Sequence, residues 1–393
     1  MTTNEGVDKT SSPEKKKQNR RGKGEGSIFQ RKDGSWTATI NLGSDTNGKR
    51  VRKTVYGATK KLVTDKLTRL QNQKLDGTYV DSGKMTVCDL LDRWLEDSAK
   101  LNTAPNTHTR YESVVRIHLK PAIGTIKLAQ LKPMHVQSML ATMERDGVGE
   151  RSRGHCYAVL RRALNVGMKW GLLIRNVCEA VDPPKQHRSE VRPLTAEQAR
   201  TILELSKKTR WHAVFALAIT TGLRQGELFA LAWDDINLDC GVLSVRHSLE
   251  EVSGKLRLKE PKSKSGRRQV TLPAGAIDAL WQHKAIQLTE GLATCPMVFC
   301  DTEGNLLRKS NFERRVWKKF RDSAEIPKTT TFHDLRHTSA TMLLGAGVHP
   351  KVVQERLGHS SIQLTMDTYS HVLPSMQQDA ATKFDRILEA KSG

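Results

Sequence analysis

The sequence predicts a multidomain, mainly α-helical protein: a small three-stranded β-sheet with a helix, then a helical bundle, then a mixed α/β domain that is mostly helical. Three observations support this expectation. β-Prone runs dominate residues 24–56, helical spacing of apolar residues dominates residues 86–182, and both kinds of run alternate from residue 194 to residue 393. A chain of 393 residues is long enough for two to four domains.

The first predicted domain covers residues 24–75 and follows residues 1–23, a polar and basic tail that we expect to be disordered. Its β-prone runs lie at 27–30, 36–42 and 50–56, with turn sequences at 32–34 and 45–48. Basic and apolar residues alternate along the third run, so the sheet should expose a basic ribbon that can enter a DNA groove. The candidate DNA contacts in this ribbon are Arg50, Arg52 and Lys53.

A linker at residues 76–85 leads to the predicted helical bundle of residues 86–182. Thr86 is suited to cap a first helix whose apolar residues share one face. A second helix, from about residue 106, is expected to stop before Pro121, because proline disrupts a helix interior. The fourth helix carries the bundle's candidate DNA contacts, which are Arg151, Arg153, Arg161 and Arg162.

A second linker, residues 183–193, begins with Pro183-Pro184 and separates the bundle from the third domain, residues 194–393. In this domain helical runs are expected at 211–230, 274–288, 310–323, 333–346 and 350–357. The β-prone runs between them lie at 242–245, 255–258 and 268–272. The pattern predicts a mixed domain rather than a second helical bundle.

The charge balance indicates the kind of partner. Lys and Arg number 64 against 42 Asp and Glu, which gives a net charge of +22 and favours an anionic polymer such as DNA. No apolar run is long enough to span a membrane, and the N-terminus lacks the apolar segment of a secretory signal. The six cysteines are not spaced as zinc ligands, so we expect no structural metal.

Short motifs in the last domain supply the groups that breaking a DNA phosphodiester requires. A tyrosine can conserve the phosphoryl bond energy in a phosphotyrosyl link, arginine forks can bind the phosphate oxygens, and a further group must protonate the leaving hydroxyl. The motifs are TGLRQGEL at 221–228, KSKSGRR at 262–268, HDLRH at 333–337, LGH at 357–359 and DTY at 367–369. The second lies between two β-prone runs and is expected at a hairpin tip.

Together these motifs resemble those of the tyrosine recombinases, or phage integrases. The match depends on one residue or pair in four of the five motifs, namely Arg224, His333 with Arg336, His359 and Tyr369. The resemblance is strong over residues 194–375. The helical segment is similar to the family's core-site-binding domain, and the first domain resembles the arm-binding domain of integrases from phages and conjugative elements.

The resemblance implies a role for each matching residue, beginning with those that hold the phosphate. Arg224 and Arg336 would clamp the scissile phosphate, and the fork of each guanidinium suits two phosphate oxygens. Glu227 would brace Arg224 rather than react. His359 would be a further contact to the phosphate.

The remaining roles concern bond formation and proton transfer. Tyr369 would be the nucleophile, and His333 would assist proton transfer there. Lys264 would protonate the leaving 5′ oxygen. Lys262 remains a rival for that role, because one sequence does not fix the register of the loop.

The resemblance also implies a biological setting. The protein would be the integrase of a mobile element, act as a homotetramer on double-stranded DNA with core and arm sites, and catalyse integration and excision. A DNA-bending protein and an excision factor are possible partners, and the expected location is the cytoplasm of a bacterial host, on the nucleoid. With no Walker-type loop and no carboxylate cluster in the sequence, we expect no nucleotide, metal or other cofactor.

Three other classes of protein share part of this pattern. A recombinase that resolves chromosome dimers is typically built from the last two domains only, and a type IB topoisomerase would not need the domain at residues 24–75. A non-enzymatic DNA-binding regulator would explain the charge and the helices. It would not explain Tyr369 together with two arginines and His359.

Overall fold

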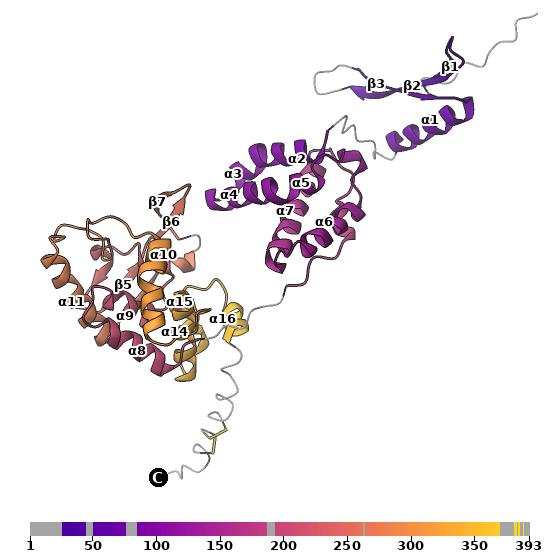
Figure 1. The fold of residues 1–393 in the computed structure, drawn as a ribbon. Helices are drawn as coiled ribbons and strands as arrows, with labels where there is room; N and C mark the ends of the chain where they lie inside the picture. The colour runs from indigo at the N-terminus through magenta and orange to yellow at the C-terminus, as the bar shows by residue number, and fades with distance from the viewer. Residues whose placement is uncertain are drawn as a thin grey trace, which may run out of the picture. The chain divides into compact units, whose positions relative to one another are not determined.

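The computed structural model describes residues 26–44, 50–75, 85–186, 193–261 and 264–369, with single residues or pairs between 381 and 388. These residues form two compact units that divide after Gln186, shown as a ribbon in Figure 1. The expected tail and most of both expected linkers lie outside the described residues. The fold is mainly helical with a small antiparallel sheet near the N-terminus, which confirms the predicted fold class.

The first structural element is a three-stranded antiparallel sheet in the order β1-β2-β3, followed by one helix. Its bounds are β1 Ser27–Gln30, β2 Trp36–Ser44, β3 Arg50–Gly57 and α1 Lys60–Leu75. Ala38 and Ile40 of β2 pack against Val63 and Leu67 of α1, and these four buried side chains form the core. The helix therefore covers one face of the sheet.

The other face of this sheet is not part of that core. The strand register aligns Phe29, Thr37 and Tyr56 in one row across it. The rings of Phe29 and Tyr56 are each 51% exposed on either side of the buried Thr37. Arg52 lies on the same face, because it is four residues before Tyr56 on β3 and side chains alternate with period two.

The helical bundle is built on a separate core of some of the largest apolar residues in the chain. Its bounds are α2 Val87–Trp94, α3 Lys100–Asn102, α4 Pro105–Val114, α5 Lys120–Ile123, α6 Pro133–Arg145 and α7 Glu150–Lys169. Thr86 caps α2 as expected, since its side chain accepts a hydrogen bond from the backbone of Asp89 and the Asp89 carboxylate accepts one from Thr86 in return.

The expectation that a helix stops before Pro121 is wrong. The helix α4 continues through a π-helical turn, Val115–Leu119, into α5, which contains the proline. In that turn Lys120 donates its backbone N–H to Val115, five residues back, so the local hydrogen-bond pattern is already shifted just before the residue that lacks an N–H. The proline is accommodated there, and Ile123 beyond it reaches the core.

The second unit consists of helices with short strands between α10 and α11. The helices are α8 Ala196–Ser206, α9 His212–Thr221, α10 Gln225–Leu228 and α11 Ala274–Thr289, followed by α12 Lys309–Phe312, α13 Lys318–Ser323, α14 Asp334–Gly345, α15 Pro350–Leu357 and α16 Ile362–Tyr369. Nearly every side chain of α9 is buried, so this helix is the centre of the core. The expected helix at 211–230 is in fact two helices, separated by a turn at Gly222.

The strands of this unit form two small antiparallel sheets. The bounds are β4 Ile236–Asn237, β5 Val242–Val245, β6 Ser248–Val252, β7 Lys255–Lys259 and β8 Arg268–Thr271. The pairing order is β4-β5-β8 in one sheet and β6-β7 in the other. The expectation that KSKSGRR lies at the tip of a hairpin is therefore wrong, because the strands on its two sides belong to different sheets.

The turn and the ion pairs between β6 and β7 explain why β7 pairs with β6 rather than with β8. Ser253 and Gly254 both have positive φ, the geometry of a tight hairpin turn, and they join β6 directly to β7. Glu250 of β6 forms ion pairs with Arg257 and Lys259 of β7. These cross-strand charge pairs hold β7 against β6 and leave β8 to pair with β5.

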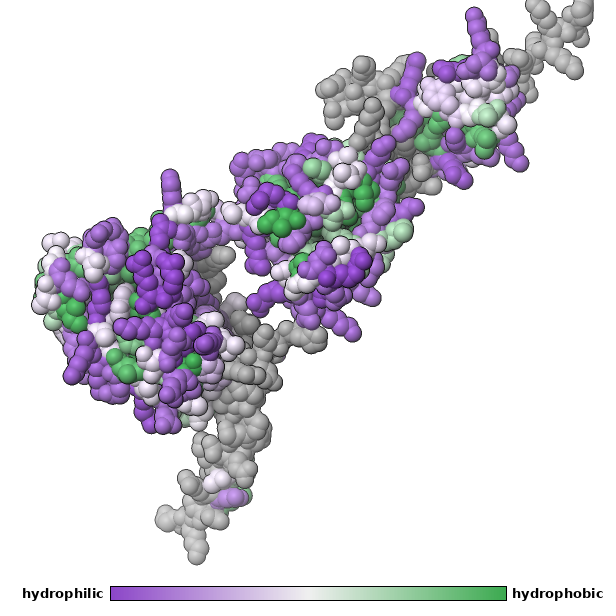
Figure 2. Space-filling view, viewed as in Figure 1, coloured by the Kyte–Doolittle hydropathy of each residue, from purple (hydrophilic) through white to green (hydrophobic). Residues whose placement is uncertain are grey.

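The molecular surface in the space-filling view is mostly hydrophilic, with apolar residues in scattered patches on each unit (Figure 2). Among the described residues no helix is long and apolar enough to cross a membrane.

Candidate active site

The TGLR motif forms the turn between α9 and α10. Gly222 ends α9 with φ 64°, in the left-handed region that favours glycine. A Cβ at this position would lie 2.5 Å from the Leu357 side chain, so close packing also requires glycine here. Arg224 directly precedes α10 in extended conformation, and its side chain is 42% exposed. The turn thus places a partly exposed arginine at a helix start.

The buried carboxylate of Glu227 holds Arg224 in place. This carboxylate, 3% exposed, accepts hydrogen bonds from Arg224 Nη1 at 2.7 Å and from the Arg224 backbone N–H at 3.0 Å. Arg268 donates to the same carboxylate at 2.8 Å. Burial alone would raise the pKa of Glu227, but the hydrogen bond and charge of Arg268 and the charge of Arg224 lower it below its usual value. The carboxylate is therefore ionised and braces both arginines.

Arg336 lies in the first turn of α14, and the residue is buried. Its Nη1 donates to the carbonyl oxygen of Gly222 at 2.7 Å. The HDLRH motif is thereby attached to the TGLR turn, although 114 residues separate the two partners. His333 directly precedes α14, three residues before Arg336, in agreement with the expected spacing.

His333 is exposed and lines a hollow of about 650 Å³ together with Arg224. Its ring lies 5.2 Å from that of His337, edge to face. Desolvation, together with the charges of His337 and Arg336, lowers the pKa of His333 to about 4. The imidazole is consequently neutral at pH 7 and carries a nitrogen lone pair that can accept a proton.

The LGH motif forms a second glycine turn, at the end of α15. Gly358 has φ 67°, and its carbonyl oxygen accepts a hydrogen bond from Arg224 Nη2 at 3.2 Å. A Cβ at Gly358 would lie 2.8 Å from Arg268 Nη1 and 2.8 Å from the Ser265 carbonyl oxygen. Only glycine fits without displacing these groups. The turn therefore packs directly against the loop before β8.

His359 follows this turn and is buried. Its Nδ1 forms a 2.9 Å hydrogen bond with the hydroxyl of Thr365 on α16. Burial and the charges of Arg336 and Arg224 lower the pKa of His359 to about 4. When the hydrogen is on Nε2, Nδ1 accepts from Thr365 and Nε2–H can donate to a phosphate oxygen.

The candidate nucleophile is placed by the same helix. Tyr369 ends α16, one helical turn after Thr365, so the bond between His359 and Thr365 fastens the helix that carries it. The side chain of Tyr369 lies outside the described part of the structure.

Of the two candidate lysines, Lys264 begins a short 3-10 turn, Lys264–Gly266, just before β8, and its side chain is not described. Lys262 lies outside the described residues. The choice between them stays a prediction.

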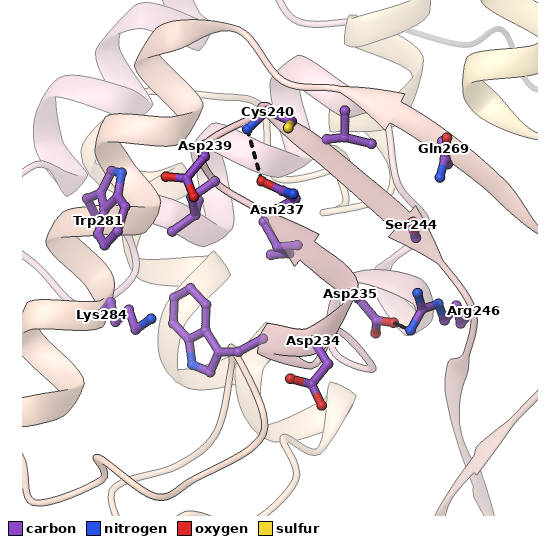
Figure 3. A pocket seen from close by; sticks show the side chains of 14 residues that line it. Asp234, Asp235, Asn237, Asp239, Cys240, Ser244, Arg246, Gln269, Trp281 and Lys284 are labelled. Atoms are coloured by element: carbon purple, nitrogen blue, oxygen red, sulfur yellow. Dashed lines mark hydrogen bonds and ion pairs between the residues drawn. The ribbon is translucent and has the colours of Figure 1, made fainter.

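A second hollow lies elsewhere on this unit and contains none of the predicted site residues (Figure 3). The Nζ of Lys284 lies 5.3 Å from the ring centroid of Trp233 and 5.7 Å from that of Trp281. Asp235 pairs with Arg246 at 3.5 Å. These charges are paired or stacked within the protein, and the hollow has no group that the predicted chemistry needs.

The predicted DNA contacts of the bundle differ in their surroundings. Arg153 is only 12% exposed and pairs with Glu144, so its charge is already neutralised. Arg162 donates to the hydroxyl of Tyr111 at 3.3 Å. Arg161 is half exposed and 3.9 Å from Glu179, and Arg151 is exposed at the start of α7.

In the sheet domain, Arg52 lies on the open face, whereas Lys53 is half-buried on the face that α1 covers. The side chain of Arg50 is not described. Sequence reasoning missed Phe29 and Tyr56, the exposed rings on the same face of the sheet as Arg52. Their period-two spacing with neighbouring polar residues is the signal that could have identified them.

Two residues of the candidate active site were also missed, namely Thr365 and Arg268. Thr365 precedes Tyr369 by four residues, and that spacing on a helix is a readable signal. Arg268 stands inside the KSKSGRR motif, but nothing local distinguishes it from Arg267. Its partners are 41 and 88 residues away.

The structure also gives a testable pH dependence. The pKa of His359 is about 4 in the folded protein against 6.5 for a free histidine, so the unfolded chain binds the proton first as pH falls. The contribution of His359 to stability is complete above pH 6.5 and is lost as pH falls toward 4. We expect the free energy of unfolding to fall by about 2–3 kcal/mol more in wild type than in His359→Gln between pH 7 and pH 4.5.

Urea unfolding of both proteins at these two pH values measures this difference. His212, His283 and His337 also have lowered pKa values, and the comparison with the variant removes their contribution. An identical pH dependence in the two proteins would show that His359 is not held neutral by its surroundings.

Comparison with known proteins gives the family. Residues 192–376 match the phage integrase family, and residues 86–143 match the phage integrase N-terminal SAM-like domain. A tyrosine recombinase XerC-like protein of Caldanaerobacter subterraneus subsp. tengcongensis is 30% identical over 370 residues, which cover 88% of this chain and 94% of that protein. An integrase of Streptomyces ambofaciens is 29% identical over 386 residues, 94% of this chain and 98% of the relative.

Solved structures agree in fold. The integrase of transposon Tn1549 in complex with transposon right end DNA has a TM-score of 0.65 at 24% identity, covering 76% of this chain and 100% of that one. A lambda integrase tetramer bound to a Holliday junction has a TM-score of 0.57 at 20% identity, covering 89% and 96%. The chain belongs to the phage integrase family. It is a tyrosine site-specific recombinase, as the sequence motifs predicted.

Proposed function

We propose that this recombinase integrates and excises a mobile element by cutting and rejoining DNA through a 3′-phosphotyrosyl intermediate on Tyr369. The observation that supports this proposal is that motifs far apart in the sequence are joined by hydrogen bonds in the structure. Arg336 donates a hydrogen bond to the TGLR turn, and Arg224 donates one to the LGH turn. His359 forms a hydrogen bond with Thr365 on the helix that ends at Tyr369. A phosphate beside these groups would meet two guanidinium forks and a neutral histidine.

The side chains of the proposed site account for every bond and proton in strand cleavage. The Tyr369 oxygen attacks phosphorus and forms the new P–O bond, while its proton passes to the neutral imidazole of His333. The bond from phosphorus to the 5′ oxygen breaks, and that oxygen takes a proton from Lys264. Arg224, Arg336 and His359 hold the charge that develops on the other phosphate oxygens. Attack by a 5′ hydroxyl of another strand reverses these steps and rejoins the DNA.

The assembly that we propose for the reaction is a homotetramer that joins two attachment sites. The solved tetramer of lambda integrase on a Holliday junction supports this proposal. A DNA-bending protein and an excision factor would be further partners, and the substrate places the reaction on the DNA of a bacterial host.

The proposal is tested by looking for a covalent complex between the protein and DNA. Wild-type protein is incubated with a labelled duplex that carries the attachment core and a nick, so that the cleaved end diffuses away and the intermediate accumulates. We expect a labelled band that survives denaturant and disappears with protease. A band shift that is lost in denaturant would instead support the non-enzymatic regulator.

The leaving-group lysine can be identified with a modified strand. Replacing the bridging 5′ oxygen by sulfur removes most of the need for a proton donor, since a thiolate departs readily. We expect Lys264→Ala to cleave normal DNA about a hundredfold more slowly than wild type and to recover on the sulfur-containing strand. Rescue of Lys262→Ala in place of Lys264→Ala would move the assignment to the other lysine.

The sheet domain has a separate role in the proposal, as the module that binds arm sites. Its open face carries Arg52, two exposed aromatic rings and other polar groups, and a sheet with such a face can enter a major groove. Linking two DNA-binding modules raises the effective concentration of each at its site only when both sites are present.

We therefore expect deletion of residues 1–80 to separate the two activities. Covalent cleavage of a short core-site duplex should stay nearly intact, and recombination between full attachment sites should be strongly reduced. The salt dependence of DNA binding should also weaken, because fewer counterions are released. Gel assays on the two substrates measure both outcomes. Full recombination by the truncated protein would favour a two-domain recombinase without an arm-binding module.

A further inference from the structure

Arg268 is an enclosed arginine beside the proposed active site, and the chemistry above gives it no role. It is the first residue of β8, two residues after the turn Lys264–Gly266. Its side chain is 7% exposed, compared with 42% for Arg224. A guanidinium so far from solvent is costly unless its hydrogen bonds are met, and its partners therefore indicate what it holds together.

Those partners come from three separate segments. Arg268 Nη2 and Nη1 donate to the two carboxylate oxygens of Glu227 at 2.8 Å and 3.3 Å. Its Nε donates to the carbonyl oxygen of Arg356, in the last turn of α15, at 2.7 Å. Nη1 also donates to the carbonyl oxygen of Gly266 at 3.2 Å. One side chain thus joins the TGLRQGEL motif, the end of α15 just before the LGH motif, and the loop of the candidate lysine.

The packing around Arg268 leaves little freedom to this loop. The backbone of Gly358 is so near to both Arg268 Nη1 and the Ser265 carbonyl that a methyl group would not fit between them. The loop residue Ser265, the LGH turn and the Arg268 fork are consequently stacked on one another. A shift of the fork would move the turn that begins at Lys264.

The charges give Arg268 a second effect, on Arg224. A single carboxylate, Glu227, lies between the two arginines. Because Arg268 neutralises that carboxylate from the buried side, Arg224 keeps its positive charge available to an anion on its exposed side. The buried pair therefore orients Arg224 without neutralising it.

We propose that Arg268 is a positioning residue for cleavage: it holds the loop of the leaving-group lysine in register with the phosphate clamp. The inference depends on the proposed function, since it assumes cleavage with a lysine as proton donor. Arg268 itself touches neither the substrate nor the reacting atoms. Its loss should mainly slow the protonation of the 5′ oxygen.

The experiment compares single-turnover cleavage of the normal strand and of the strand with a bridging 5′ sulfur, at saturating DNA. Arg268→Met should cleave the normal strand about tenfold or more slowly than wild type and return to within about threefold of it on the sulfur strand. Arg267→Met is the matched control, because Arg267 is the neighbouring arginine, 60% exposed and paired with Glu260 at the surface. It should cleave both strands at the wild-type rate.

A second pair of variants guards against misfolding. Removing Arg268 alone leaves the buried Glu227 with one partner, so Arg268→Met combined with Glu227→Gln removes the unbalanced charge. Arg268→Lys keeps the charge but cannot reach Glu227, Gly266 and Arg356 together. Each should show the same preference for the sulfur strand, with folding checked by thermal melting.

Two results would overturn the inference. In the first, Arg268 variants that fold are equally slow on both strands, which would place the effect in the clamp or in the fold. In the second, they cleave the normal strand as fast as wild type. Failure of wild type to form an adduct on either strand would instead reject the proposed function, and with it this inference.

Discussion

Tyr369→Phe is expected to bind core-site DNA with wild-type affinity and to form no covalent complex at all. The substitution removes one oxygen atom, which is the only atom that becomes bonded to phosphorus. The helix that carries residue 369 should be unaffected, because its described anchor is the hydrogen bond between His359 and Thr365. Cleavage should therefore fall below detection while a gel shift without denaturant stays unchanged.

The matched control is Tyr79→Phe, which removes the same atom from a tyrosine in the predicted linker. It should form the adduct at the wild-type rate. Mapping the labelled peptide of the wild-type adduct then identifies the bonded residue directly. A denaturant-resistant adduct in Tyr369→Phe would assign the nucleophile to another side chain.

Arg224→Lys is expected to lower the cleavage rate by a hundredfold or more, or about 3 kcal/mol in the transition state. Arginine has five N–H donors, and Arg224 uses one on the side chain of Glu227 and one on the carbonyl of Gly358. The remaining donors can bind two phosphate oxygens while the fork is held. An ammonium group has three donors at one point and cannot serve all of these partners.

Single-turnover rates at saturating DNA measure this effect apart from binding. Arg314→Lys, at an exposed arginine of the same unit, is the control and should change the rate little. The sulfur-containing strand should not rescue Arg224→Lys, because the clamp acts on the phosphate and not on the leaving oxygen. A rate within a few-fold of wild type would make Arg224 an ordinary surface arginine.

Much of the architecture around these residues could be predicted because its signals are local. The helix predicted at 350–357 ends at Gly358, which has positive φ, and His359 follows directly after it. The sequence spacing between His333 and Arg336 similarly places both at the start of α14. Local signals thus located the turn at Gly358 and the start of α14, but not the turn at Gly222, where one helix was expected to run on to residue 230. The roles of these side chains stay predictions.

The features that could not be predicted depend on distant partners. The choice of β6 as the partner of β7 follows from the ion pairs of Glu250 and from a turn that the β-prone runs alone did not reveal. The passage of a helix across Pro121 depends on a π-helical turn just before it. The role of Arg268 as a junction follows from partners in α10 and α15. Local propensity carries no information on such contacts.

The bonds that brace the active site also determine when the enzyme becomes dangerous to DNA. Arg224 depends on the carbonyl of residue 358, and Arg336 depends on that of residue 222, so each clamp arginine is oriented by chain that lies more than a hundred residues away. Contacts of such long range form late in folding. A nascent chain still on the ribosome, or one released before Gly358, carries Arg224 paired with Glu227 but without the hydrogen bond to residue 358. Synthesis itself therefore delays the cutting activity until nearly the whole domain has been made.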